Sequence, residues 1–312
     1  MCRRCGEEGR DLLGSHPLTS GATARSLIVC ADDFGLDPAI NQAVEEAHQH
    51  GILSAASLMV GAPAAAEAVA RARRLPDLGV GLHLVLADGW PVLPPSQIPG
   101  LVRRDGKFDQ SMGRAAIGFF LLRRTRRELA MEIRAQFEAF RATGLPLDHV
   151  NAHKHIHLHP TVADLILEIG RDFGMKAVRV PSEPVRLLRR AFPGERFPAP
   201  LYWPWISSLR RKLRRARLIA NDHVFGVSWS GAMIEERLVR LLAQLPDGIS
   251  EIYCHPATAS TPRLTAAMPG YRHRDEYAAL LSAGLKAQIA QQGLRVTRYA
   301  DLARVAHTTD TV

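Results

Sequence analysis

Short apolar runs alternate with helix-like stretches along most of this chain, and that alternation restricts its fold more than any other feature. Seven runs are predicted as buried strands: residues 26–31, 54–60, 79–86, 147–150, 176–181, 250–254 and 295–299. Strands that alternate with helices in this way form parallel βαβ units. A chain of 312 residues accommodates them in one large domain. The sequence therefore predicts an α/β protein, of which a (β/α) barrel is the natural closed form.

The first predicted helix has clear signals at both ends. Asp37 is a favourable N-cap residue, Pro38 fits the first helical turn, and Gly51 is placed to end the helix. Further helices are predicted at residues 64–74 and 161–173. Each of them follows a predicted strand, as a parallel α/β protein requires.

The positive charge of the chain is concentrated in two insertions. Residues 114–127 contain five basic residues and no acidic one, and residues 186–217 contain ten basic residues against Glu195 alone. Because the whole chain carries only +9, the remainder is net acidic. This asymmetry indicates contact with an anionic surface at one place, either a membrane or a nucleic acid. A solvated insertion is the simpler alternative.

Residues 1–25 are predicted to be a disordered leader, and residues 26–306 a single domain. The leader lacks the apolar core of a secretory signal, and the apolar stretch 52–70 is interrupted too often to span a membrane. Cys2 and Cys5 form one C-x-x-C pair with no second pair, so no zinc finger is expected. The predicted location is the cytoplasm, with peripheral attachment to the inner face of the membrane as an option.

The densest polar motif is the histidine run at residues 153–159. Residues two apart on an extended chain face the same side, so His153, His155 and His157 are predicted to share a face. Imidazole is the commonest metal ligand in proteins. One or two of these histidines are expected to bind a metal ion while the others support the site. A polar strand end without a metal is the alternative.

Other polar residues end several of the predicted strands. Asp32 and Asp33 follow the first strand, and His83 lies within the third. Arg179 ends the fifth strand and His255 ends the sixth. The carboxyl ends of parallel barrel strands meet at one face. We therefore expect these residues to join the histidine run in one site, although an isolated buried histidine is more often a hydrogen-bonded core residue.

These side-chain types fit a hydrolytic metal centre. One carboxylate and two imidazoles leave a divalent metal ion with open positions. Asp33 is the predicted carboxylate ligand, Asp32 the base that accepts a proton from water, and His255 the acid that protonates the leaving group. The sequence contains no G-x-S-x-G, G-x-G-x-x-G or P-loop motif. It therefore predicts a metal-dependent hydrolase rather than a serine hydrolase or a nucleotide-binding enzyme.

Four motifs resemble those of the YdjC-like carbohydrate deacetylase family. They are ADDFG at 31–35, GLHL at 81–84, HKHIH at 153–157 and CHP at 254–256. They occur in the order found in that family, and the resemblance runs from about residue 26 to about residue 303. The family is similar to polysaccharide deacetylases, so the resemblance implies an irregular, TIM-barrel-like (β/α) barrel.

The resemblance also implies a role for each matching residue. Asp33, His83 and His153 would hold one divalent metal ion, and Asp32 and His255 would be catalytic. Zn is the first expectation for the metal, with Mg, Mn or Co left open. His155, His157 and Arg179 would support the site or contact the substrate, with a structural salt bridge as the alternative for Arg179.

One position departs from the family pattern. Asn151 and Ala152 stand where the family usually has Asp-Ser before the first clustered histidine. Groups behind a metal ligand orient it and tune its basicity. We therefore expect weaker support for His153.

Within the family, the chain looks most like the branch associated with hopanoid biosynthesis, which implies an N-acetylglucosaminyl hopanoid as substrate. The insertion at 186–217 agrees with this, because Trp203 and Trp205 alternate there with basic residues. Indole rings favour the membrane interface and arginines favour anionic head groups. No nucleic-acid partner is expected, because no RNP, KH or helix-turn-helix signature is present. A homo-oligomer is left open.

The predicted function is removal of an acetyl group from an N-acetylated amino sugar carried on a lipid. Three alternatives remain at the level of sequence. They are a deacetylase of soluble chitooligosaccharides, a metal-dependent phosphoesterase, and a membrane-binding module whose metal site is structural.

Overall fold

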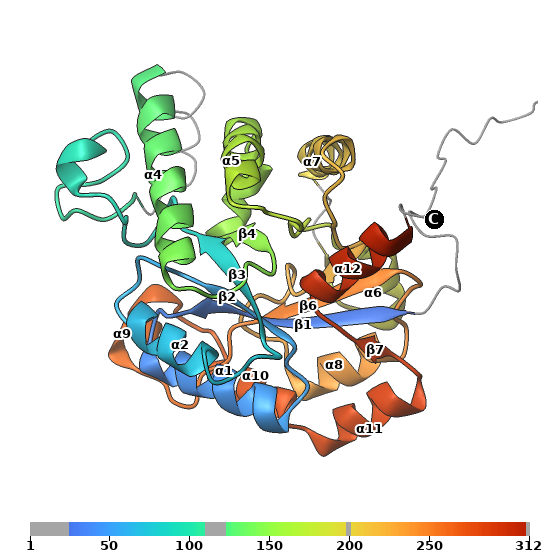
Figure 1. The fold of residues 1–312 in the computed structure, drawn as a ribbon. Helices are drawn as coiled ribbons and strands as arrows, with labels where there is room; N and C mark the ends of the chain where they lie inside the picture. The colour runs from blue at the N-terminus through green and yellow to red at the C-terminus, as the bar shows by residue number, and fades with distance from the viewer. Residues whose placement is uncertain (1–24, 110–122, 198–200, 310–312) are drawn as a thin grey trace, which may run out of the picture.

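A parallel sheet forms the centre of the protein in a computed structural model that describes residues 25–109, 123–197 and 201–309 (Figure 1). Its strands are β1 (Ser26–Phe34), β2 (Ala55–Leu58), β3 (Gly79–Leu84), β4 (Val150–Ala152), β5 (His223–Phe225), β6 (Ile249–Cys254) and β7 (Arg295–Val296). The strand order is β4-β3-β2-β1-β6-β5, with β7 paired to β1 outside this path. All these pairings are parallel. The predicted α/β class is confirmed.

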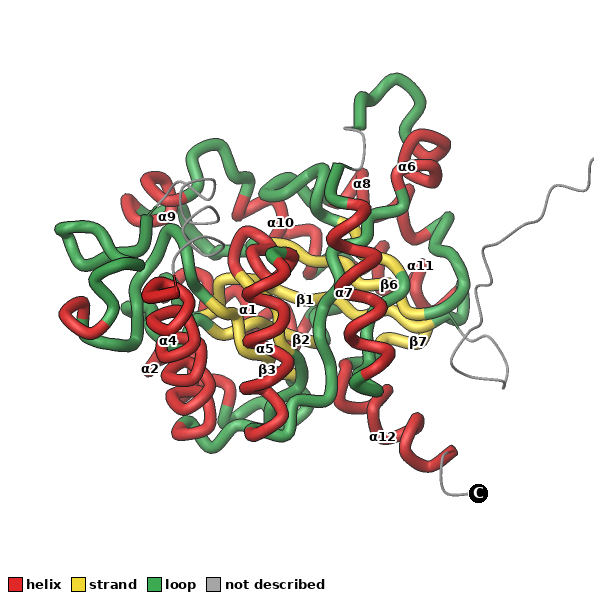
Figure 2. Tube along the Cα trace, turned by 90° about the horizontal axis from the view of Figure 1, so that it is seen from above, coloured by secondary structure: helices red, strands yellow, loops and turns green. Residues whose placement is uncertain are grey.

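Helices cover the sheet on two sides. They are α1 (Pro38–His50), α2 (Ala65–Ala72), α4 (Arg123–Ala142), α5 (Pro160–Asp172), α6 (Val185–Ala191), α7 (Trp203–Arg215), α8 (Glu235–Leu242), α9 (Pro262–Ala267), α10 (His273–Leu280), α11 (Ala283–Gln291) and α12 (Tyr299–Thr309), with short 3-10 turns η1 (Pro95–Gln97) and η2 (His153–Leu158). Figure 1 shows α4, α5 and α7 above the strands and α1, α8, α10 and α11 below them. Seen from above in Figure 2, α4, α5 and α7 lie side by side. Among the described helices, none is long and apolar enough to cross a membrane.

The sheet forms a half-barrel, and its regular strands do not close into a TIM barrel within the described ranges. The prediction of a regular fifth strand at 176–181 is wrong. That segment makes only isolated parallel bridges, from Val178 to Val150 and from Ala177 to Ile219. Closure as a complete barrel is therefore not borne out, although these bridges continue the pairing beyond β4.

A side chain explains why the predicted fifth strand stays irregular. Asn221 Oδ1 accepts a hydrogen bond from Val180 N at 2.7 Å, and Asn221 Nδ2 donates to Val180 O at 2.8 Å. The amide thereby occupies both backbone groups that a neighbouring strand would use. Asn221 is itself fully buried, so no strand can replace it at this position. The sequence analysis also missed β5, which follows Asn221 and has only three residues.

Strand β1 lies in the middle of the sheet and is buried on both faces. Leu27, Val29 and Ala31 belong to the main hydrophobic core, whereas Ile28 and Cys30 belong to a smaller one. A strand covered on both faces appears as a continuous apolar run rather than an alternating one. That apolar run predicted the strand only as far as residue 31. The strand in fact continues to residue 34.

Helix α1 forms with the predicted caps. Asp37 Oδ1 accepts from Ala39 N at 3.0 Å, and Gly51 N donates to Ala47 O at 3.0 Å. A Cβ at position 51 would lie 2.3 Å from Leu280 O, so only glycine fits there. This helix fixes the loop that leaves β1 and thereby the position of the residues at the end of that strand.

The predicted leader and most of the first basic insertion lie outside the described residues. The second insertion contains α6 and α7, both helical. Helix α7 buries Ile206, Leu209 and Leu213 against the rest of the protein. Arg211, Arg214 and Arg215 of this helix are exposed.

Candidate active site

Two adjacent carboxylates end β1, and an irregularity in the strand brings both to the same cleft. The register between β1 and β2 shifts between Ala31 and Phe34, and Asp33 has a left-handed φ of 63°. Successive residues of a regular strand point to opposite faces, whereas a bulge redirects one of them. Asp32 and Asp33 therefore both line the cleft.

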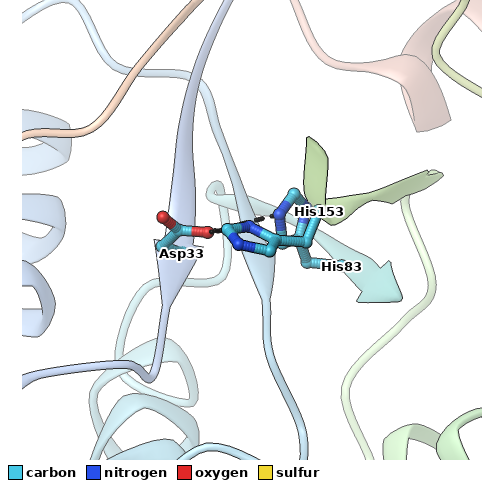
Figure 3. A group of neighbouring side chains, drawn as sticks. All are labelled: Asp33, His83 and His153. Carbon is cyan, nitrogen blue, oxygen red and sulfur yellow. Dashed lines mark ion pairs between the residues drawn. The ribbon is translucent and has the colours of Figure 1, made fainter. Parts of the chain in front are cut away.

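Asp33, His83 and His153 form the cluster that was predicted as a metal site (Figure 3). Asp33 Oδ1 lies 3.3 Å from His83 Nε2 and 3.2 Å from His153 Nδ1. The three side chains come from β1, from β3 and from the first residue of η2, directly after β4. The three offered ligand atoms lie within 4.8 Å of one another.

The Asp33 carboxylate has the environment of a cation ligand. It is fully buried, and within the described part of the chain neither of its oxygens has a hydrogen-bond partner. Burial alone would raise its pKa, but His153 and His83 hold the pKa of this carboxyl well below its usual range. A buried carboxylate without hydrogen bonds is costly unless a cation compensates it. One carboxylate and two imidazoles are a donor set that suits a divalent metal ion.

The histidine run is not an extended strand, so the prediction of a shared histidine face is wrong. Lys154 and His155 have left-handed φ values of 53° and 54° and turn the chain after His153. His155 Nε2 lies 3.1 Å from Tyr253 Oη, and His157 Nε2 lies 3.0 Å from Arg179 O. Burial lowers the pKa of His157 to about 3 and lowers that of His155 strongly as well. Of the three histidines, only His153 lies in the group with Asp33 and His83 that could hold a metal ion.

Arg179 lies beneath the cleft and binds Asp32. The guanidinium is fully buried and donates to Asp32 Oδ2 at 2.5 Å and to Asp32 Oδ1 at 2.9 Å. It also donates to Glu251 Oε1 at 2.9 Å and 2.6 Å. Although burial raises the pKa of Asp32, the charge of Arg179 outweighs it and holds that pKa well below its usual range. Asp32 is therefore ionised and fixed in orientation.

Asn151 takes part in the site through a partner other than the one we expected. Its Oδ1 lies 2.7 Å from His83 Nδ1, and its Nδ2 donates to Ser57 Oγ at 2.8 Å. Turning the amide gives each of its ends a complementary partner, because Nδ2 then donates to His83 Nδ1 at 2.7 Å while Oδ1 accepts from Arg179 at 2.9 Å and from Ser57 Oγ at 2.8 Å. A metal ion on His83 Nε2 would instead require a proton on His83 Nδ1 and so would favour the orientation with Oδ1 toward His83. The residue thus supports His83, and the expected effect on His153 is not what its contacts indicate.

His255 leaves the end of β6 on the other side of β1 from His83 and His153. Its backbone is held from both sides, because His255 N donates to Glu276 Oε2 at 2.6 Å and His273 Nδ1 donates to His255 O at 2.6 Å. Its own Nδ1 has no hydrogen-bond partner in the described part of the protein. Burial lowers the pKa of His255, and the nearby Asp33 and Asp32 oppose that shift.

The cleft above these residues has a volume of about 770 Å³. Its polar lining includes Asp32, Asp33, His83, His153, His155 and His255. Its apolar lining includes Leu36, Met59, Val85, Trp90, Met268 and Pro269. The cleft thus offers both hydrogen-bonding groups and an apolar wall to a small organic molecule.

A known protein family matches most of this chain. The YdjC-like protein model matches residues 26–291. The chain belongs to the YdjC-like family. The match covers every residue of the predicted metal and catalytic set.

Curated proteins similar to this YdjC-like chain carry deacetylase names. A carbohydrate deacetylase of Geobacillus stearothermophilus is 30% identical over 276 residues, which are 88% of this chain and 97% of that protein. A chitooligosaccharide deacetylase of Serratia marcescens is 31% identical over 284 residues, which are 88% of this chain and 98% of that protein.

A solved structure shares the fold of this YdjC-like protein. It is described as a candidate cellobiose-phosphate cleavage protein of Enterococcus faecalis V583. It is 24% identical with a TM-score of 0.71, and the match covers 89% of this chain and 99% of the other. At this level of identity the likeness concerns the fold alone.

The structure brings most of the predicted site residues of this YdjC-like protein together, but not all of them. Asp32, Asp33, His83, His153, His155 and His255 line the cleft. His157 and Arg179 are buried beside it and are not part of its lining. Trp203 and Trp205 lie on α7, are 56% and 42% exposed, and are not among the residues that line the cleft.

Sequence reasoning missed two residues that touch these groups. Tyr253 Oη is hydrogen-bonded to His155 Nε2, and Glu251 Oε1 accepts a hydrogen bond from Arg179. Both lie on β6 and are separated from each other, and Tyr253 from His255, by one residue. The alternation of polar residues along that predicted strand was the available signal, because residues 251, 253 and 255 share one face.

Proposed function

We propose that this protein is a metal-dependent hydrolase that removes the acetyl group from an N-acetylated amino sugar. One observation carries the proposal. The ionised, buried Asp33 carboxylate has ring nitrogens of His83 and His153 at 3.3 Å and 3.2 Å and no hydrogen bond among the described residues. The deacetylase names of similar proteins support the acetyl group as the part of the substrate that reacts.

The surrounding residues supply the remaining chemistry. A divalent metal ion held by Asp33, His83 and His153 would polarise an acetyl carbonyl and lower the pKa of a water molecule. Asp32, kept ionised and oriented by Arg179, accepts a proton from the attacking water.

His255 is the proton donor of the proposed reaction and lies across β1 from His83 and His153. When protonated, it gives a proton to the departing amine, so that the amide C–N bond breaks and acetate and a free amine result. Burial lowers the pKa of His255, which makes its protonated form a ready donor. Its backbone contacts with Glu276 and His273 hold the imidazole at the cleft.

The test is release of acetate from N-acetylated chitooligosaccharides by the purified protein. We expect activity that disappears after treatment with a chelator and returns when Zn²⁺, Mg²⁺, Mn²⁺ or Co²⁺ is added back. A phosphate monoester assayed in parallel addresses the phosphoesterase alternative. Hydrolysis of the phosphate ester without release of acetate from any N-acetylated sugar would contradict the proposal.

We further propose that the natural substrate is an N-acetylglucosaminyl hopanoid, taken from an anionic membrane surface. Residues at the start of α7 are strongly exposed: Leu201 (77%), Tyr202 (64%), Trp203 (56%) and Trp205 (42%). Arg211, Arg214 and Arg215 are exposed on the same helix. Aromatic and apolar side chains beside arginines suit the interface of an anionic membrane. The apolar lining of the cleft suits the lipid portion of such a substrate.

A soluble chitooligosaccharide is the second candidate substrate, favoured by the name of the Serratia marcescens relative. The two candidates are separated by comparing kcat/KM for chitobiose with kcat/KM for a lipid-linked N-acetylglucosamine in vesicles. A higher value for the lipid-linked sugar supports the hopanoid-type substrate. A higher value for chitobiose replaces it with the soluble one.

A further inference from the structure

Strained backbone is concentrated around the cleft. The described residues include five non-glycine residues with positive φ, namely Asp33, Asp88, Lys154, His155 and Arg217. The first four all line the cleft. A left-handed conformation is unfavourable for a non-glycine residue and persists only where its surroundings impose it. Contacts around the cleft must therefore stabilise these backbone conformations.

Two of the strained residues contact each other through their side chains. Lys154 Nζ forms an ion pair with Asp88 Oδ2. Lys154 directly follows His153, and Asp88 lies five residues after His83. The pair therefore connects the two segments that supply the imidazoles of the metal-ligand cluster, although neither of its members belongs to that cluster.

The Asp88 side of this contact is firmly attached. Asp88 N donates to Asp109 O at 3.1 Å, and Phe108 N donates to Gly89 O at 3.0 Å. At the start of the same loop, the side chain of Gln136 accepts from Val85 N at 2.9 Å and donates to Val85 O at 2.7 Å. Asp88 is thus a fixed point on the wall of the cleft.

On the other side of the contact, the Lys154 side chain is bound by Asp88, and the neighbouring His155 is held by Tyr253 Oη, 3.1 Å from its Nε2. Lys154 and His155 form the left-handed turn between β4 and the rest of η2. That turn begins directly after His153, whose ring is the more exposed of the two imidazoles, at 14% against 2% for His83. An ion pair that fixes this turn to the cleft wall fixes His153 as well.

We propose that Lys154 and Asp88 form a positioning clamp for the metal centre. The clamp holds His153 Nδ1 toward Asp33 and His83, so that metal affinity depends on two side chains that do not bind the metal. This inference rests on the proposed metal-dependent function. A partly exposed ion pair adds little to overall stability, so its expected effect is on the geometry of the site.

The substitutions Asp88→Asn and Lys154→Asn test the clamp. Asparagine is among the residues that best tolerate a left-handed backbone, so each change removes the ion pair without adding backbone strain. We expect the Zn²⁺ affinity, measured by competition with a chromophoric chelator, to fall roughly 10- to 100-fold in each variant, as for other groups that orient metal ligands. The visible spectrum of the Co²⁺-loaded protein should change in both. The double variant should be no weaker than either single one, because both remove the same interaction.

Asp164→Asn is the matched control. It breaks another lysine–aspartate pair, Lys212 with Asp164, which joins α7 to α5. Neither of these residues lines the cleft. The Zn²⁺ affinity and the Co²⁺ spectrum of this variant should match those of the wild type. The Tm of every metal-free variant should stay within about 2 °C of the wild type.

Several outcomes overturn the clamp. Wild-type Zn²⁺ affinity in Asp88→Asn and Lys154→Asn would show that the pair does not position His153. Additive losses in the double variant, or a loss accompanied by a larger fall in the metal-free Tm, would indicate two independent structural effects. A wild-type protein that binds no divalent ion would remove the metal centre itself and the proposed function with it, which is a different result from equal binding by all variants.

Discussion

Asp32 and Asp33 are adjacent in the chain, yet their carboxylates have different partners. Asp32 is bound by Arg179, whereas Asp33 faces His83 and His153. Asp33→Ala should therefore lose the bound metal, and His83→Ala should lose most of it. Asp32→Asn should keep the metal and lose about 100-fold or more in turnover, because the base is missing. Arg179 remains paired with Glu251 in that variant, so the fold should persist.

Elemental analysis and turnover measured on the same preparations check this division of roles. His255→Ala should resemble Asp32→Asn, with metal retained and turnover lost. Equal loss of metal from the Asp32 and Asp33 variants would show that both carboxylates are ligands.

Glu276 makes stability depend on pH. It is fully buried and accepts hydrogen bonds from Met233 N at 2.7 Å and from His255 N at 2.6 Å. Burial raises its pKa from 4.5 to about 7. Between these values the folded protein binds a proton that the unfolded chain releases. The contribution of Glu276 is therefore constant below pH 4.5 and is lost as pH rises toward 7, by on the order of 3 kcal/mol.

Glu276→Gln should remove this part of the pH dependence, even though the amide is a poorer acceptor for two N–H groups. The measurement is the free energy of unfolding in urea at intervals from pH 4.5 to 8 for both proteins. Contributions of the other titrating groups cancel in the difference between the two curves. Parallel curves would mean that Glu276 titrates normally in the folded protein.

At the residue scale, the sequence predicts which side chains meet in the candidate metal cluster better than it predicts the residues behind them. Asp33 and His83 do lie together with His153, and they were identifiable because the motifs around them are specific. The contact of Asn151 with His83 was not identifiable, because it depends on which nitrogen of the His83 ring faces β4. Glu251 was missed for a similar reason, because its partner Arg179 is 72 residues away.

Helix α4 carries a row of buried polar side chains that fasten the loop after β3. Glu128, Glu132 and Gln136 are spaced four residues apart and lie on one face. Glu132 accepts from Val92 N at 2.9 Å and from Leu93 N at 3.1 Å. Burial raises the pKa of Glu132, which means that this site favours the uncharged carboxyl over the carboxylate more than water does.

Glu132→Ala should lower the free energy of unfolding by about 1–3 kcal/mol, because two backbone N–H groups lose their acceptor. Urea unfolding monitored by circular dichroism measures this loss. Glu138→Ala is the matched control, since Glu138 lies exposed on the same helix and should change stability by less than about 0.5 kcal/mol. Equal effects of the two substitutions would show that the loss is one of helix propensity or charge rather than of loop attachment.

Element boundaries were predicted best where local signals mark them. Helix α1 follows its caps, and α5 begins and ends within one residue of the predicted range. The end of β1 was misjudged because two acidic residues normally mark a strand end. Here they remain in the strand, one bound to Arg179 and the other next to two imidazoles. Strand β5 is too short to produce a periodic signal.

For the whole molecule, alternation of strands and helices was enough to predict a parallel α/β fold. It was not enough to predict whether the sheet closes. Closure depends on the contact between residues 177–180 and 219–221, where the Asn221 side chain replaces regular pairing. Such a substitution of a side chain for a strand has no periodic signature. The concentration of basic residues in two insertions, by contrast, can be read directly from the sequence. It bears on the outer surface of the protein rather than on its fold.

The exposed start of α7 leads to the last prediction, which concerns membrane binding. The protein should co-sediment with anionic liposomes and much less with neutral ones, because each basic residue near the surface contributes about 1 kcal/mol. Binding should weaken with salt, as the Debye length falls to about 3 Å at 1 M. Trp203→Ala with Trp205→Ala should reduce binding further. Val239→Ala is the control, because Val239 is 41% exposed on α8, below the sheet (Figure 1).

The same variants separate membrane binding from catalysis. Neither tryptophan lines the cleft, so the double tryptophan variant should keep its kcat/KM for chitobiose and lose activity on a lipid-linked N-acetylglucosamine in anionic vesicles. Equal loss on both substrates would mean that the insertion shapes the cleft rather than docking on a membrane. Equal binding to anionic and neutral liposomes would contradict the electrostatic part of the proposal, because arginines on α7 would then have no partner at the surface.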